Sequence, residues 1–152
     1  MALLKRVLYN ILCKNLEDSV AFYTALVDFR ILYQSDWYVV LTPPGQDNVQ
    51  LGLIDQVSEF TPRHAWGMHQ GTFLTFVVDD VFEAVERARE LGVDVIEEPV
   101  ALAYGQSRAL IRDVNGLVLD LSTPTEELTE RYDLEFVESD KTTAIDQQQA
   151  EE

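Results

Sequence analysis

The feature that most constrains this chain is an order of predicted elements, one strand, one helix and three strands, that occurs twice. The apolar alternation of residues 6–14 predicts a strand, and Asn15 suits the N-cap of a helix over 16–28. Three strands are expected next, and the order then restarts. The further strands are predicted at 29–35, 37–43, 49–55, 72–78, 93–98, 107–113 and 116–122, and the second helix at 79–92.

A shift of 65 residues places the two halves in register, pairing Asn15 with Asp80 and Leu8 with Phe73. With five more loop residues in the second copy, Gln50 pairs with Asp120. Each half then has a sheet with one helix-covered face. The predicted fold class is α+β, with two tandem βαβββ modules.

The chain of 152 residues is strongly acidic, with a net charge of −16. Nucleic acid and anionic membrane surfaces are excluded as partners, because phosphate binding needs clustered Lys and Arg. No apolar run approaches the ~20 residues of a membrane helix, and the start of the chain shows no signal peptide. The single cysteine, Cys13, allows no intrachain disulfide, so we expect a cytoplasmic protein.

The expected organisation is one domain over residues 1–124, with modules at about 6–55 and 71–123, and an acidic tail over 125–152. The tail holds ten acidic and two basic residues. A short helix is predicted at its start, with Leu128, Tyr132 and Phe136 on one side. The remainder is polar enough to be unfolded in isolation.

One carboxylate stands out within an apolar strand. Asp120 lies between Leu119 and Leu121, just after a turn built on Asn115 and Gly116. Such an acid is costly to bury unless something pairs with it. Three interpretations are open, namely a metal ligand, a catalytic acid or base with a raised pKa, and a structural carboxylate. For the structural role the expected partners are Gln50, Asn10 and Ser122.

Four segments together resemble the vicinal oxygen chelate superfamily, which includes glyoxalase I, bleomycin-resistance proteins and extradiol dioxygenases. They are "NLEDSVAFYTALVDF", "SDWYVVL", "VVDDVFEAVERARELGV" and "YGQSRALIRDVNGLVLDL". Asp28 and Val114 depart from the family pattern, at positions where Gly and Pro are usual. The resemblance implies a glyoxalase-like protein with a cupped mixed β-sheet, helices outside it and frequent dimerisation.

The resemblance also implies where a metal would be held. In metal-dependent members the ligands lie on the first and fourth strands of each module, and those positions here are Leu8, Gln50, Phe73 and Asp120. Leucine and phenylalanine offer no ligand atom, and one carboxylate with one amide does not hold a catalytic ion. We therefore expect a lost metal site, no cofactor and no metal ligand.

Further candidates for ligand binding come from the same resemblance. Trp37, Tyr38, Trp66 and Tyr104 are the aromatic residues nearest the family's cavity, with core packing as the alternative role. Gln106 lies in a segment that borders the ligand in relatives. His64 and His69 in the irregular connector lack the spacing of metal ligands, and a surface loop is the simpler interpretation. Arg108 and Arg112 alternate along a strand, and salt bridges are their expected role.

The leading hypothesis is a homodimeric protein that binds a small, partly hydrophobic molecule in a metal-free cleft. Its predicted ligand-binding residues are Trp37, Tyr38, Gln50, Phe73, Trp66, Tyr104, Gln106 and Asp120. The alternative is a lyase, isomerase or dioxygenase that uses an atypical metal set or Asp120 as its acid or base. A third hypothesis is an accessory domain in which the tail matters more than the cleft.

Overall fold

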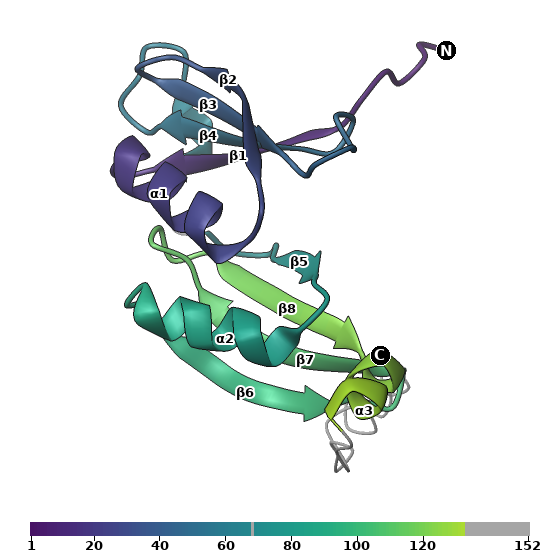
Figure 1. Cartoon of the computed structure of the whole chain (residues 1–152). Coiled ribbons are helices and arrows are strands. Elements are labelled where there is room, and N and C mark those ends of the chain that lie inside the picture. Colours follow the sequence, from purple (N-terminus) through teal and green to yellow (C-terminus); the bar gives the residue numbers. More distant parts are fainter. Residues whose placement is uncertain (68, 133–152) are drawn as a thin grey trace, which may run out of the picture. The chain divides into compact units, whose positions relative to one another are not determined.

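The computed structural model describes residues 1–67 and 69–132, and these form two compact units. The first unit comprises the described residues up to Gln70 together with the turn 114–117, and the second begins at Gly71 and holds the other described residues. Each unit contains one four-stranded sheet (Figure 1). The predicted fold class is confirmed, because each unit has the order strand, helix and three strands.

The first unit begins with β1 and the helix α1, which are followed by a three-stranded meander. Its elements are β1 (Leu8–Cys13), α1 (Leu16–Leu26), β2 (Arg30–Gln34), β3 (Tyr38–Thr42), β4 (Gln50–Asp55) and the 3-10 helix η1 (Arg63–Ala65). The strand order is β1-β4-β3-β2, with β1 parallel to β4 and the other neighbours antiparallel.

The second unit repeats this arrangement and adds a terminal helix. Its elements are β5 (Leu74–Val77), α2 (Val81–Glu90), β6 (Val95–Ala101), β7 (Gln106–Arg112), β8 (Val118–Pro124) and α3 (Thr125–Tyr132). The strand order is β5-β8-β7-β6, with β5 parallel to β8. In the part of the chain that the structure describes, no helix is both long and apolar enough to cross a membrane.

The two main helices begin at equivalent residues, as the shift of 65 predicts. The side chain of Asn15 accepts a hydrogen bond from the backbone N–H of Asp18, and that of Asp80 accepts from the N–H groups of Phe82 and Glu83. These bonds satisfy N–H groups that a helix leaves unpaired at its start. Capping chemistry in the sequence therefore places both helices.

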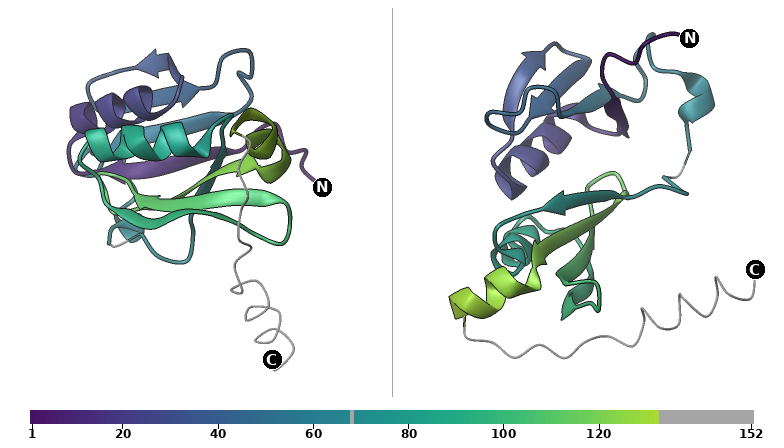
Figure 2. Two further views of the ribbon diagram at one scale, coloured as in Figure 1. Left: turned by 60° about the horizontal axis from the view of Figure 1, so that its bottom comes forward. Right: turned by 90° about the vertical axis from the view of Figure 1, so that its right-hand side faces the viewer.

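Each helix covers one face of its own sheet (Figures 1 and 2). In the first unit the covered face carries alternate residues such as Ile11, Leu41 and Leu53, all fully buried. In the second unit Ile111 and Leu119 occupy the corresponding positions and are also fully buried. The core of each unit lies between sheet and helix, which leaves the chemistry of the opposite sheet face free to vary.

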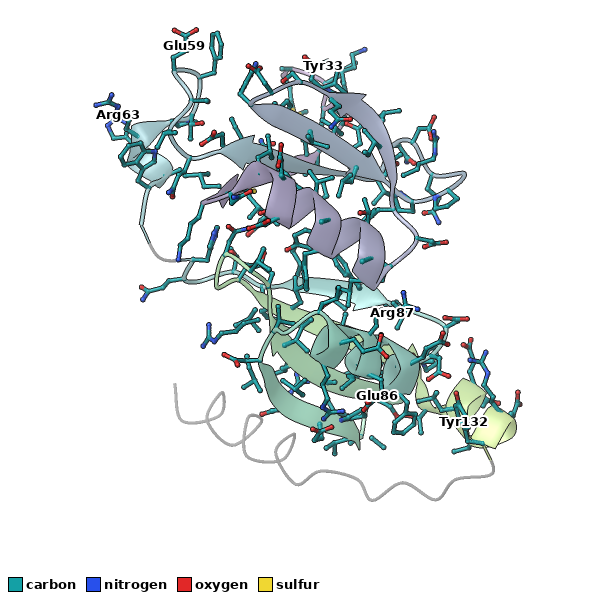
Figure 3. The ribbon with its side chains drawn as sticks, turned by 60° about the vertical axis from the view of Figure 1, so that its left-hand side comes forward. Tyr33, Glu59, Arg63, Glu86, Arg87 and Tyr132 are labelled. Carbon is teal, nitrogen blue, oxygen red and sulfur yellow. The ribbon has the colours of Figure 1, made fainter. Side chains whose placement is uncertain are left out.

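The strand β6 runs three residues beyond the predicted end at 98 and includes Pro99. A proline is tolerated here because β6 is an edge strand, where one side of the backbone needs no partner. The terminal helix α3 holds Leu128 in the core, and Tyr132 at its end bonds to the buried Asp80 (Figure 3). Phe136 and the predicted unfolded remainder of the tail lie outside the described residues.

The turn between β7 and β8 is held by Asn115. Its side-chain oxygen accepts from the backbone N–H of Lys14 at 3.0 Å, and its Nδ2 donates to Ser19 Oγ at 3.0 Å. Asn115 and Ser19 are both buried. The turn therefore belongs to the first unit although its neighbours in sequence belong to the second.

We expect Asn115→Ala to lower the free energy of unfolding by about 1–3 kcal/mol, because it leaves the partners of a buried amide unsatisfied. Urea unfolding followed by circular dichroism measures this change. The control is Asn48→Ala at an exposed turn residue. An equal effect of the two substitutions would contradict the assigned role of Asn115.

Candidate functional site

The register of the second sheet brings Asp120 together with side chains from three strands. Asp120 on β8 lies opposite Thr75 on β5 and Leu110 on β7, and Ser122 lies opposite Arg108. Directly opposed residues share a face of a sheet, as do alternate residues along a strand. We call this surface the Asp120 face; its members are Thr75, Val77, Gln106, Arg108, Leu110, Arg112, Val118, Asp120 and Ser122.

The carboxylate of Asp120 is buried with only one of its oxygens hydrogen bonded. Its Oδ2 accepts from Thr75 Oγ1 at 3.0 Å. Its Oδ1 has no hydrogen-bond partner among the described residues, although the residue is only 6% exposed. A buried oxygen atom that has no hydrogen-bond partner is rare in native structures and needs an explanation.

The partner of Asp120 differs from those expected of a structural carboxylate. Thr75 takes that role, whereas Gln50 and Asn10 belong to the first unit and bond to other residues. Sequence reasoning missed Thr75, because the shift of 65 places Phe73 rather than Thr75 beside Asp120. The sequence signal that could have identified Thr75 is that it is the polar residue in the apolar run "FLTFVV".

Charge on the Asp120 face is partly balanced by Arg108. A salt bridge at 3.6 Å joins Arg108 Nη2 to Glu97 Oε2 on the neighbouring strand, and both side chains are largely buried. The expected salt bridge of Arg108 is therefore confirmed. Among the described residues Arg108 forms no salt bridge with Asp120, although its charge acts on the Asp120 carboxyl from a greater distance.

Burial raises the pKa of the Asp120 carboxyl above its ordinary value. The hydrogen bond from Thr75 and the positive charge of Arg108 act in the opposite direction and are the smaller effects. Desolvation has this effect on any buried carboxyl group, and groups with perturbed pKa values are enriched at functional sites.

A second unsatisfied acceptor lies on the same face. Gln106 opens β7 opposite Pro124, four residues along β8 from Asp120, and its buried Oε1 has no hydrogen-bond partner among the described residues. Both unsatisfied atoms are acceptors. The Asp120 face can therefore take up hydrogen-bond donors.

Four of the predicted ligand-binding residues belong to the first unit. Gln50 bonds through its side chain to Arg6 and to the backbone of Asp47. Tyr38 donates to Asn10, and Trp37 stacks on Tyr38 with ring centroids 5.4 Å apart. The fourth residue, Trp66, is 50% exposed beside η1, where Arg63 lies 5.7 Å from its ring centroid (Figure 3).

The remaining aromatic candidates lie in the second unit. Phe73 directly precedes β5 and is 58% exposed, and Tyr104 in the turn before β7 is 57% exposed. Neither residue belongs to the core of the described structure, and the same holds for Trp66. Core packing, the alternative role expected for Trp66 and Tyr104, is thus excluded for these two side chains.

Comparison with known proteins identifies the family. The sequence profile of the Glyoxalase/Bleomycin resistance protein/Dioxygenase superfamily matches residues 5–121. The chain belongs to this superfamily, as its resemblance predicts. No curated protein matches the sequence.

Solved structures share the fold at low sequence identity. A hypothetical protein, SA1046 of S. aureus, is 22% identical with a TM-score of 0.63, over 80% of this chain and 95% of that chain. A family member from Burkholderia phytofirmans is 20% identical with a TM-score of 0.62, over 77% and 96% of the two chains. TioX from Micromonospora is 17% identical with a TM-score of 0.63, over 79% and 98%.

The resemblance implies four metal-ligand positions, Leu8, Gln50, Phe73 and Asp120, and the side chains at these positions offer few ligand atoms. The register places Leu8 opposite Gln50 and Thr75 opposite Asp120, so a hydroxyl rather than the predicted Phe73 faces the carboxylate. Neither pair supplies the several charged or imidazole ligands that a catalytic cation needs. Throughout residues 1–67 and 69–132, no three His, Cys, Asp or Glu side chains gather as a metal-binding group.

The raised pKa of Asp120 predicts a pH dependence of stability. The folded chain keeps this proton to higher pH than the unfolded chain, so stability falls as pH rises from about 4 through the raised pKa. Asp120→Asn removes that titration. We expect the free energy of unfolding of wild type to fall relative to Asp120→Asn over this range, by about 1.4 kcal/mol for each pH unit that separates the folded and unfolded pKa values.

Urea unfolding of dilute protein at a series of pH values measures the difference. Asp28→Asn is the matched control, since it makes the same charge change at an exposed position. A difference between wild type and Asp120→Asn that stays constant with pH would show that the fold does not perturb the Asp120 carboxyl.

Proposed function

We propose that this protein binds a small, partly hydrophobic molecule on the Asp120 face, through a hydrogen-bond donor of the ligand and without a metal ion. The observation that carries the proposal is the buried Oδ1 of Asp120, which has no partner among the described residues. An unpaired carboxylate oxygen costs free energy in the folded protein. A ligand N–H or O–H group directed at Oδ1 removes that cost.

The surroundings of Asp120 support a ligand with an apolar body. Val77 is 67% exposed on the same face, and Phe73 is 58% exposed just before β5. Small-molecule sites commonly combine apolar surface with a few polar groups that fix orientation. The unsatisfied Oε1 of Gln106 offers a second acceptor for the same ligand class.

Electrostatics favours a cationic donor over a neutral one. The salt bridge from Glu97 already engages Arg108, and the chain as a whole carries a net charge of −16. A negative field raises the local concentration of cations and their rate of association. An ammonium or amidinium group attached to an aromatic or aliphatic body is therefore the proposed ligand chemistry.

Catalysis by Asp120 is the second candidate function. The raised pKa supports it, because an acid or base works best when its pKa approaches the working pH. In this proposal the unpartnered Oδ1 takes a proton from a bound substrate instead of only binding it. Turnover that Asp120→Asn abolishes, with ligand binding retained, would favour the enzyme.

The remaining expectations for this chain stay proposals. Trp37, Tyr38, Gln50, Trp66 and Tyr104 are proposed to contribute to ligand binding. We further propose a cytoplasmic homodimer. Light scattering of micromolar protein should give a mass near twice 17.3 kDa, and a monomer mass would contradict the dimer.

Benzamidine tests the proposed ligand chemistry, because it joins an aromatic ring to a cationic donor group. We expect calorimetry to detect binding to wild type in the presence of EDTA. Asp120→Asn keeps the shape of the side chain and removes its charge, so it should weaken binding about tenfold or more.

Asp28→Asn again controls for net charge and should leave the affinity unchanged. Equal binding by wild type and Asp120→Asn, with both folded, would place the ligand elsewhere. Binding that EDTA abolishes would overturn the metal-free proposal.

A further inference from the structure

The uncovered face of the first sheet carries a polar cluster made of Arg6, Asn10, Tyr38 and Gln50. Asn10 on β1 lies opposite Gly52 on β4. Tyr38 comes from the next strand, β3, and its hydroxyl reaches the side chain of Asn10. None of the four side chains is buried, so packing of the core does not account for their arrangement.

Gly52 makes room for this cluster. A Cβ at this position would lie 2.1 Å from Asn10 Oδ1 and 2.8 Å from Tyr38 Oη. The amide of Asn10 thus lies directly over the strand, in space that any other residue would fill. Glycine inside a strand weakens it and often marks a close approach by another group.

A hydrogen bond fixes the orientation of the Asn10 amide. Tyr38 Oη donates to Asn10 Oδ1 at 2.7 Å, which occupies the amide oxygen. The Nδ2 group makes no hydrogen bond among the described residues and is left to donate elsewhere. An exposed side chain held in one orientation has already lost the freedom that binding would otherwise remove.

The guanidinium of Arg6 is tied to the same cluster. Its Nη1 donates to Gln50 Oε1 at 3.1 Å, and Gln50 Nε2 donates in turn to the backbone oxygen of Asp47 at 2.7 Å. Its charge is close enough to lower the pKa of Tyr38, although burial raises that pKa by more. The cluster therefore joins a cation to an oriented amide donor.

Aromatic surface adjoins these donors. The ring of Tyr33 is centred 6.2 Å from that of Tyr38, and Tyr33 is 50% exposed on the sheet of the first unit (Figure 3). An aromatic ring on this surface would contact the tyrosines, while an anionic substituent would reach the donors. Carboxylates form strong charge-assisted hydrogen bonds with guanidinium groups.

We propose that this cluster is a binding site for the carboxylate of a small aromatic acid, with Arg6 and Asn10 as the donors. The site takes a ligand of opposite charge to the one proposed for the Asp120 face. Its two donors, Arg6 and Asn10, are not among the residues proposed to bind the cationic ligand, so variants of these two residues test it separately.

Titration with benzoate, followed by calorimetry, tests the site. Arg6→Gln removes the cation, and we expect it to weaken binding about tenfold. Lys5→Gln makes the same charge change at the neighbouring exposed residue and should leave the affinity within about twofold. Equal weakening by the two substitutions would reveal a nonspecific charge effect and overturn the proposal.

A second pair of variants tests the oriented amide. Asn10→Asp keeps the acceptor for Tyr38 but replaces the donor with a negative charge, so benzoate binding should be lost. Gly52→Ala should weaken binding because its Cβ displaces the amide. Circular dichroism verifies that each variant folds.

Asp120→Asn separates this proposal from the proposed function. This substitution should leave the affinity for benzoate unchanged, even if it weakens the binding of benzamidine. No binding of benzoate to wild type, or unchanged binding to both Arg6→Gln and Asn10→Asp, would overturn the site.

Discussion

Parallel pairing between the first and last strands of each unit is the constraint on which the structure depends. β1 pairs with β4 and β5 with β8, and a parallel pair needs a long crossover between its members. In each unit that crossover begins with a helix, which covers one sheet face and forms the core. The opposite face is then released from core packing. Asp120 and Asn10 lie on these uncovered faces, within the parallel pairs themselves.

The two uncovered faces differ in chemistry although the backbone pattern is the same. In the second unit the unsatisfied atoms are acceptors, Asp120 Oδ1 and Gln106 Oε1. In the first unit the corresponding surface offers donors from Arg6 and Asn10 around tyrosine rings. Two units with the same fold therefore do not have the same site, because side chains on the uncovered face are not required for the core.

Much of the fold was predictable because its signals are local. The N-caps Asn15 and Asp80 and the alternating apolar residues each act within a few residues of where they stand. The site was less predictable. Thr75 and not Phe73 faces Asp120, because the register of a strand is set by the strand with which it pairs. A register shift of two residues keeps every side chain on the same face, so the apolar pattern does not distinguish Thr75 from Phe73. The sequence did not predict that β6 extends through Pro99. A proline is tolerated in a strand at the edge of a sheet, and the position of β6 at the edge is known only from the tertiary structure.

The sequence by itself determined the order of elements, because this follows from residue types and their spacing, and its match to a family profile determined the superfamily. The resemblance to that family further implied that Leu8 and Gln50 stand at metal-ligand positions. Only the tertiary structure decided which atoms lack partners. Whether Asp120 Oδ1 is satisfied depends on strands that are more than forty residues apart in the chain. The role of Gly52 is likewise known only from the tertiary structure, because the side chains that lie over it, Asn10 and Tyr38, come from two other strands. Hydrogen bonding and close approach are properties of positions in space, and no pattern along the chain encodes them.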